Sequence, residues 1–355
     1  MGTNCCKRKN NPNDILNEDE KQEIKNFQDN KIIEEPIKKN CINIKLINKL
    51  KHSKINDKIE EVITLPNLEN TIIIGCRSGN IKEISGITSE NNSKILDLYS
   101  CGRRLFSLIL LKNNNNLCIG LENEILFLKF NLDDPHKLEK KFEITLNEEG
   151  PIYSLLELKN GNLISAGTNI ILWEKNISSK YKQIKTIAIG NHRIINLIEF
   201  PFYNAILATQ ENTNIIYLLK NYQTSIDLIK TKENIPSIWY KGSAQNFSKS
   251  AMILVGKFEL NIIDGKNGEV VSKYPDIDKG NLLKIKNNFW IVSYFMGNGL
   301  DFYEQEGNDL FFYNKIELDK CNSFGWGHRL VKINDECFAA TNHYGYIFVY
   351  QIIKE

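Results

Sequence analysis

The stretch IYSLLELKNGNLISAGTNIILWEKN, residues 152–176, contains three short apolar segments separated by two polar turns. The turns, Lys-Asn-Gly-Asn and Gly-Thr-Asn, are rich in the residue types that accept the positive φ of tight β-hairpins. The stretch therefore predicts three consecutive antiparallel strands. Six other segments show a short strand, a polar turn and a second short strand: 71–84, 117–128, 206–219, 252–265, 290–304 and 337–351.

One large apolar residue recurs near the end of each unit. The seven residues are Ile84, Leu128, Trp173, Leu218, Ile263, Tyr303 and Tyr350. They are separated by 44, 45, 45, 45, 40 and 47 residues. A period of about 40–45 residues built from strands is typical of a β-propeller. We therefore predict an all-β, seven-bladed propeller over residues 41–355, with a six- or eight-bladed ring as the alternative.

Residues 41–50, CINIKLINKL, alternate like a strand and come before the first unit. The seventh unit has no further strand after Tyr350. We predict that the 41–50 strand pairs with the last blade and closes the ring, because closure removes exposed sheet edges. Residues 1–40 are highly charged and contain few large apolar residues, which predicts a flexible or partly helical tail.

Three segments resemble the WD-repeat propeller family. ILWE (171–174) stands where that family ends its third strand with Trp-Asp, and LNIIDGKNGEVV (260–271) resembles the family's strand–Asp–turn–Gly–strand ending. GHRLVKI (327–333) carries a Gly-His pair at the family's blade start. The chain thus resembles a divergent member of this family. The resemblance implies a rigid platform for binding other proteins.

The overall composition excludes several classes of protein. The 355 residues carry a formal net charge of +2, which favours neither nucleic-acid binding nor strong attraction to a membrane surface. No apolar run approaches the roughly 18–20 residues of a membrane-spanning helix. The eight cysteines form no C-x-x-C pair and no zinc-spaced quartet. We expect a reduced, cytosolic compartment.

The N-terminal sequence MGTNCCKRK resembles an acylation signal. Once Met1 is removed, Gly2 matches the start of the myristoylation pattern, although Cys6 stands where Ser or Thr is usual. Cys5 and Cys6 are candidates for palmitoylation, and Lys7, Arg8 and Lys9 would attract an anionic leaflet. One acyl chain binds a membrane only weakly, so two signals are needed for stable anchoring. A chance occurrence and a vicinal metal or redox pair are the alternatives.

The loops that enter the innermost strands predict a binding surface. The predicted strands begin at Leu105, Ile152, Ile194, Ile235, Leu282 and Leu330. The residue before three of them is an arginine, namely Arg104, Arg193 and Arg329, and His192 and His328 precede the last two arginines. In a closed ring these side chains would meet at the mouth of the central channel. Arginine favours bidentate recognition of carboxylate or phosphate. We predict a partner-binding top face for an acidic or phosphorylated protein segment.

A structural role for these arginines is the alternative. They would then cap blade starts and pair with local carboxylates such as Glu60, Glu61 or Glu233.

Catalysis is not expected, and neither is a cofactor or a bound metal. The sequence contains no H-E-x-x-H, G-x-S-x-G, P-loop or dinucleotide motif. No carboxylate pair accompanies His192 or His328. A hydrolytic or metal-dependent propeller is therefore the third hypothesis. Our first hypothesis is a scaffold tethered by lipid to the cytoplasmic face of a membrane. The second is a soluble cytosolic propeller subunit of a multiprotein complex.

Overall fold

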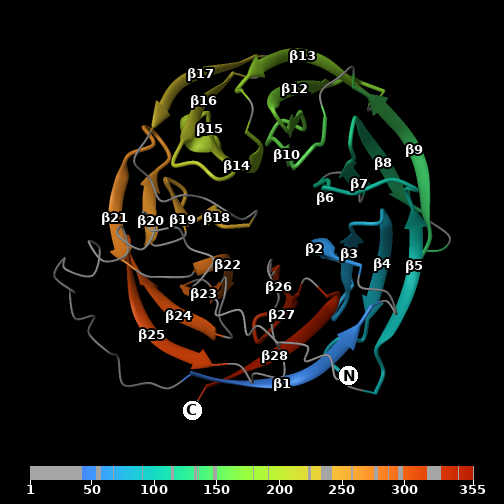
Figure 1. Ribbon diagram of the computed structural model, residues 1–355, viewed down its shortest axis with the longest axis vertical. Helices are drawn as coiled ribbons and strands as arrows, with labels where there is room; N and C mark the ends of the chain where they lie inside the picture. The colour runs from blue at the N-terminus through green and yellow to red at the C-terminus, as the bar shows by residue number, and fades with distance from the viewer. Residues whose placement is uncertain are drawn as a thin grey trace, which may run out of the picture. The chain divides into compact units, whose positions relative to one another are not determined.

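The computed structural model describes residues 42–354, apart from short gaps, and contains strands almost exclusively. The gaps are 53–56, 67, 90, 113–115, 132–133, 135, 147–149, 179, 191, 223–224, 233–241, 257–258, 276–278, 287, 295–298, 318–328 and 343. Seven four-stranded antiparallel sheets are arranged as the blades of a ring (Figure 1). The prediction of an all-β, seven-bladed propeller is confirmed.

Within each of the first six blades, the strands follow chain order from the centre outward. Blades 1 and 2 contain β2 (Ile59–Thr64), β3 (Ile72–Cys76), β4 (Asn80–Ser85), β5 (Lys94–Ser100), β6 (Ser107–Leu110), β7 (Asn116–Gly120), β8 (Glu124–Phe130) and β9 (Leu138–Thr145). Blades 3 and 4 contain β10 (Ser154–Glu157), β11 (Leu163–Ala166), β12 (Asn169–Lys175), β13 (Tyr181–Ala188), β14 (Ile194–Phe200), β15 (Ala205–Gln210), β16 (Ile216–Tyr222) and β17 (Ser225–Lys232), with one 3-10 turn, η2 (Pro201–Tyr203).

Blades 5 and 6 contain β18 (Ala244–Asn246), β19 (Ala251–Val255), β20 (Glu259–Asp264), β21 (Val270–Pro275), β22 (Lys279–Lys286), β23 (Phe289–Tyr294), β24 (Gly299–Glu306) and β25 (Asp309–Glu317). Blade 7 contains β26 (Leu330–Lys332), β27 (Cys337–Thr341), β28 (Tyr346–Lys354) and, as its outer strand, β1 (Ile42–Lys51).

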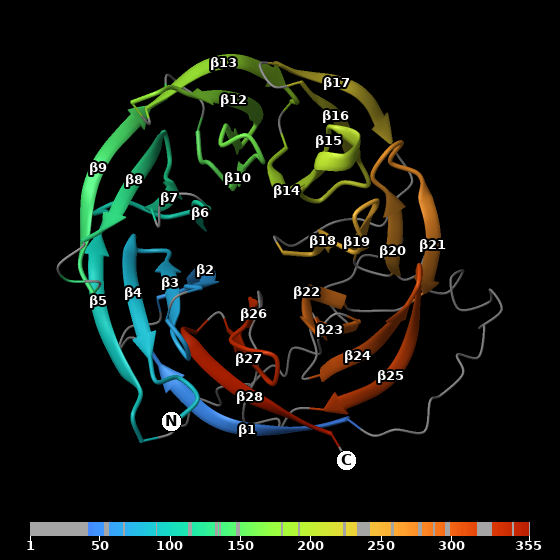
Figure 2. The same ribbon diagram turned by 180° about the vertical axis from the view of Figure 1, so that it is seen from behind.

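The predicted closure of the ring is therefore confirmed. β1 pairs antiparallel with β28, so that Ile42 lies opposite Lys354 and Lys51 lies opposite Tyr346. Both views show the two strands running together across the seam (Figures 1 and 2). Strands from the two ends of the described chain thus complete one sheet, and β1 pairs with the outer edge of β28.

The recurring apolar residue occupies the third strand of every blade. Each of the seven side chains is no more than 3% exposed. A break in the register with the outer strand lies beside this residue in six blades, for example between Leu172 and Trp173. Such bulges increase strand twist. In these six blades the recurring residue therefore lies beside a bulge.

Large side chains fill the spaces between blades. Phe127 of blade 2 stacks on Tyr181 of blade 3 with 5.0 Å between ring centroids. Within blade 3, the Trp173 indole N–H donates a hydrogen bond to the Ser165 hydroxyl over 2.8 Å. The ring centroid of Phe247 in blade 5 lies 5.8 Å from that of Trp290 in blade 6. Adjacent blades thus share their cores, as expected for units that cannot bury their faces alone.

One predicted strand start differs from the described strand. The prediction places the start of the innermost strand of blade 5 at Ile235, which lies outside the described residues, whereas the innermost described strand is β18 (Ala244–Asn246). The pairing of Ala244 with Leu254 fixes this three-residue strand. Its sequence, AQN, has no apolar run, so its place depends on the neighbouring strand rather than on its own pattern.

A buried carboxylate joins blades 1 and 2. Glu83 of β4 is 0% exposed, and its Oε2 lies 3.0 Å from Nδ1 of His136, which is in the loop after β8. The Glu83 hydrogen bond and charge raise the pKa of the half-exposed His136 imidazole, and Asp134 adds to this effect. The imidazolium form is therefore favoured where it faces Glu83.

We expect His136→Gln to flatten the pH dependence of stability. A histidine whose pKa rises on folding stabilises the fold below its unfolded pKa of about 6.5, and this stabilisation disappears as pH rises through the folded pKa. Wild type should thus lose more stability than the variant between about pH 6 and 8. Urea denaturation at several pH values measures this difference. Identical pH slopes for the two proteins would show that the Glu83–His136 contact is not populated.

Candidate functional site

Part of the predicted site lies outside the described residues. The predicted lipidation residues Gly2, Cys5 and Cys6, the basic residues Lys7, Arg8 and Lys9, and His328 all belong to this group. The structure describes Arg104, His192, Arg193 and Arg329.

The loops into β6, β10 and β14 share one backbone contact. The N–H groups of Leu105, Ile152 and Ile194 each donate to a carbonyl just beyond the second strand of the preceding blade, over 3.4, 3.0 and 2.8 Å. These three positions are therefore structurally equivalent, which agrees with their prediction as corresponding starts of inner strands. Figure 1 shows their strands side by side around the centre of the ring.

Gly79 fixes the backbone that carries Arg104. It has φ of +93°, and a Cβ there would lie 2.0 Å from the Arg103 carbonyl oxygen. The Cys101 N–H also donates to the Gly79 carbonyl over 2.9 Å. A glycine is required both for the left-handed conformation and for this close approach.

Two arginines and two aromatic rings form a continuous array, which we call the arginine–aromatic cluster: Arg104, Phe106, Tyr153 and Arg193. The Arg104 guanidinium lies 4.6 Å from the Phe106 ring centroid, and the Arg193 guanidinium lies 4.8 Å from the Tyr153 centroid. The two rings meet edge to face at 5.2 Å. The cluster spans the inner entries of blades 2, 3 and 4.

The two guanidiniums differ in their charge partners. Arg193 forms an exposed ion pair with Glu211, with 3.3 Å between Nη1 and Oε2. Arg104 is exposed and forms no ion pair with any residue in the described part of the chain. Its neighbour Arg103 is paired with Glu124 instead. Arg104 thus presents an uncompensated cation beside Phe106.

The ring of Tyr153 is half-buried between these charges. Burial raises the pKa of its phenol, and Arg193 partly offsets the increase. The phenol therefore stays neutral at physiological pH and can donate a hydrogen bond to an anion. His192 is exposed next to Arg193, and its carbonyl accepts a hydrogen bond from the Gln210 amide over 3.4 Å.

Arg329 lies apart from the cluster, between blades 7 and 1. Its Nε donates to the Glu60 carbonyl over 2.8 Å and lies 3.8 Å from a Glu61 carboxylate oxygen. Burial lowers the pKa of the guanidinium to about 10. The structural alternative, in which an arginine caps a blade start near Glu60 and Glu61, therefore fits this arginine.

Arg329 also lines a cavity of about 200 Å³ in the central channel. Inner-strand residues of six blades surround it, among them Glu61, Ser154, Asn196, Gln245 and Asn281. Oδ1 of Asn281 is buried there with no hydrogen-bond partner. The lining of the cavity thus combines polar side chains with apolar ones such as Val62 and Leu282.

One thiol lies beside an imidazole in the described part of the chain. The Cys76 thiol lies 3.6 Å from Nδ1 of His52, but both residues are buried. Burial raises the thiol pKa to about 12, so the thiolate that a nucleophile requires is scarce. In the described part of the chain, no three His, Cys, Asp or Glu side chains gather where a metal ion could bind.

No helix among the described residues is long and apolar enough to cross a membrane.

Sequence reasoning missed Phe106 and Tyr153. Phe106 lies two residues after Arg104, and Tyr153 lies two residues after Pro151, the residue that precedes the predicted strand at Ile152. Side chains two residues apart share a face of an extended chain. This spacing was the available signal, but the contact between Tyr153 and Arg193 joins two blades and could not be read from it.

Of the comparisons with known proteins, the one with solved structures gives a match, and this match bears on the fold alone. No family model matches the chain, and no curated protein matches it. Among solved structures, the WD40 domain of Neurospora crassa Pan2 superimposes with a TM-score of 0.64 at 9% identity, covering 87% of this chain and 95% of that one. At this identity the match establishes a WD40-type propeller fold.

Proposed function

We propose that this propeller is a protein-interaction scaffold whose arginine–aromatic cluster captures an acidic or phosphorylated segment of a partner. The carrying observation is the exposed Arg104 guanidinium, which stacks on Phe106 and has no charge partner in the described part of the chain. Stacking holds the guanidinium plane in place, which reduces the entropy lost when it binds an anion bidentately.

The neighbouring groups favour the same class of ligand. Arg193 exchanges its weak, exposed pair with Glu211 for a ligand anion at little cost, since such surface pairs contribute only about 0–1 kcal/mol. Tyr153 lies between the two arginines and offers a neutral hydroxyl donor. An extended segment with two anionic groups matches this array. The same exposed surface supports our proposal that the protein binds a partner rather than catalyses a reaction.

Reversing the two charges tests this function. We expect Arg104→Glu/Arg193→Glu to reduce capture of partner proteins from lysate by about tenfold or more, because two charge-assisted contacts are replaced by repulsion. Quantitative mass spectrometry of proteins retained on the immobilised full chain provides the measurement.

The matched control reverses two exposed lysines on outer strands, in Lys94→Glu/Lys182→Glu. It changes the net charge by the same amount and should leave capture unchanged. If both double variants lose the same partners, bulk charge rather than the cluster is responsible. If neither loses any, the cluster is not the capture site.

We also propose that the scaffold is tethered to the cytoplasmic face of a membrane through acylation of Gly2, Cys5 and Cys6. The support is the N-terminal sequence, in which two candidate lipid sites stand beside Lys7, Arg8 and Lys9. One acyl chain gives only marginal binding, so anchoring here takes both lipid signals, and the basic residues strengthen it.

We expect wild type to sediment with cell membranes and both Gly2→Ala and Cys5→Ser/Cys6→Ser to become soluble. The reason is that each variant removes one of two signals that are needed together. Fractionation followed by immunoblotting measures the partition, with Lys94→Glu as a control that leaves the N-terminus intact. A wild-type protein found in the soluble fraction would favour the alternative, a cytosolic propeller subunit of a larger complex.

A further inference from the structure

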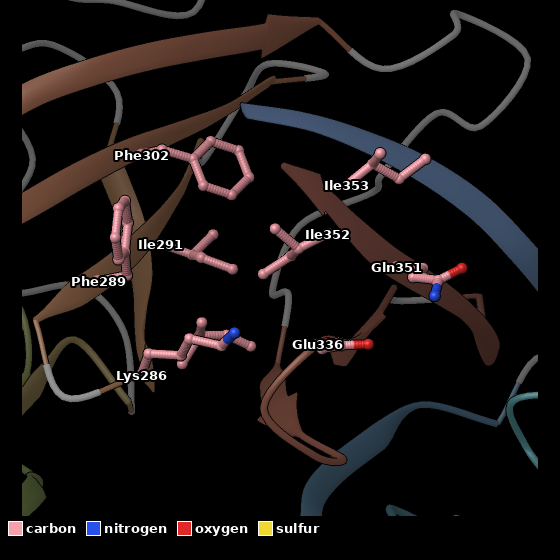
Figure 3. Close-up of a pocket in the computed structure, with 9 residues that line it drawn as sticks. Lys286, Phe289, Ile291, Phe302, Glu336, Gln351, Ile352 and Ile353 are labelled. Carbon is pink, nitrogen blue, oxygen red and sulfur yellow. The ribbon is translucent and has the colours of Figure 1, made fainter. Parts of the chain in front are cut away.

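A second candidate surface lies between blades 6 and 7. It is a groove of about 350 Å³ that no part of the arginine–aromatic cluster touches. Figure 3 shows its two walls facing each other. One wall comes from blade 6 and the other from blade 7: Ile285, Lys286, Phe289, Ile291 and Phe302 on one side, and Glu336, Gln351, Ile352 and Ile353 on the other.

The floor of the groove is apolar and buried. Ile291 and Phe302 are 0% and 1% exposed, because they belong to the core between the two blades. Ile352 is half-buried against this core, and Ile353 at the rim is 40% exposed. A side chain entering the groove would therefore meet a preformed apolar wall, which lowers the entropy cost of binding.

Two opposite charges line the groove. Lys286 ends β22, and Glu336 lies in the turn between β26 and β27. Neither side chain forms an ion pair with a described residue, although neighbouring Asp335 pairs with Lys332 over 2.5 Å. The groove thus offers a cation on one wall, an anion on the other and an apolar floor.

Two other seams at the same end of the blades are closed by carboxylates. Glu157 accepts a hydrogen bond from the Lys112 N–H over 2.5 Å across the seam of blades 2 and 3. Across the seam of blades 3 and 4, Oε1 and Oε2 of Glu199 both accept the Lys159 N–H, over 3.1 and 3.0 Å. At the seam of blades 6 and 7 the corresponding turns flank the open groove instead.

We propose that this groove docks a short protein segment with one large apolar side chain flanked by an acidic and a basic residue. The apolar side chain fills the groove, the acidic residue meets Lys286 and the basic residue meets Glu336. A volume of about 350 Å³ admits one aromatic or large aliphatic side chain with space for part of a neighbour. A buried anchor with a polar rim is the usual arrangement of an interface hot spot.

The charges argue against other occupants. An anionic membrane surface would favour cations on both walls. A stable dimer of two copies needs about 1,200–2,000 Å² of buried surface, far more than a groove of this size supplies.

The groove and the cluster lie at opposite ends of the inner strands. The cluster lies where those strands begin, and the groove lies where they end. A scaffold could therefore hold two partners at once.

Titration of the full chain with defined probes tests the proposal. The probes are the fluorescein-labelled peptides Glu-Ser-Trp-Ser-Lys and Gln-Ser-Trp-Ser-Gln, followed by fluorescence anisotropy. We expect wild type to bind the charged peptide about fivefold more tightly, because only that peptide places an anion opposite Lys286 and a cation opposite Glu336. The variant Lys286→Gln/Glu336→Gln should bind the two peptides with equal affinity.

Ile353→Ser should weaken binding of the preferred peptide about fivefold, because it removes part of the apolar rim. The matched control is Ile229→Ser on β17, which removes an isoleucine of similar exposure, 53% against 40%, and should change nothing. Equal affinity of wild type for both peptides, or binding that neither Ile353→Ser nor Lys286→Gln/Glu336→Gln alters, overturns the proposal. If the wild-type protein self-associates and Ile353→Ser abolishes this self-association, the proposal is also overturned, because the groove then binds a second copy of this chain.

Discussion

Trp290→Ala is expected to reduce the free energy of unfolding by about 3–5 kcal/mol. Trp290 is 0% exposed in β23 and packs against Phe247 of the neighbouring blade. Its indole N–H also donates to the Gln305 side chain over 3.1 Å. Truncation would therefore leave a cavity between two blades and remove a hydrogen-bond donor, and both effects destabilise the fold.

Chemical denaturation followed by circular dichroism measures the loss. Phe202→Ala is the matched control, since it removes a large aromatic side chain that is 78% exposed in η2. Substitutions at exposed sites usually change stability by less than about 0.5 kcal/mol. A loss below about 1 kcal/mol for Trp290→Ala would contradict the packing of blades 5 and 6 described above.

A disulfide across the closing seam is expected to stabilise the ring by about 3–5 kcal/mol. Lys45 of β1 lies directly opposite Gln351 of β28. Opposed residues of antiparallel strands have Cα atoms about 4.5–5.5 Å apart, which suits a disulfide. Because Lys45→Cys/Gln351→Cys would close a loop of roughly 300 residues, it removes much of the entropy of the unfolded chain.

The stabilisation should appear under oxidising conditions and disappear on reduction. Moving one cysteine by a single residue, in Lys45→Cys/Ile352→Cys, gives the matched control, because adjacent residues of a strand face opposite sides of the sheet. That pair should not crosslink. Crosslinking of the shifted pair in place of the opposed pair would contradict the register between β1 and β28.

The recurring apolar residue was the feature that the sequence predicted best. Trp173 and its six counterparts are buried because each unit repeats the same local pattern of strand, turn and strand. The closing strand was also predictable, since residues 42–51 alternate and the seventh unit lacked an outer strand. Both inferences depend on local pattern and on the topology of a closed ring.

Features that depend on contact between blades were not predictable. The contact between Arg193 and Tyr153 joins blade 4 to blade 3, and residues so far apart in the chain carry no shared local signal. The same reason applies to the groove, whose walls Phe302 and Ile352 come from different blades. The contacts of Arg329 with Glu60 and Glu61, in contrast, match the structural alternative that the sequence offered for the arginines. β18 was not predicted at its described position because its three residues are specified by pairing alone.

The central claim is that the arginine–aromatic cluster binds an anionic segment of a partner. Its most direct test is a calorimetric titration of the full chain with a captured partner segment, in phosphorylated and unphosphorylated forms, at low and high salt. We predict tighter binding of the more anionic form, weakening with salt and lost in Arg104→Glu/Arg193→Glu. Equal binding of both forms, unaffected by salt or by the charge reversal, would contradict it.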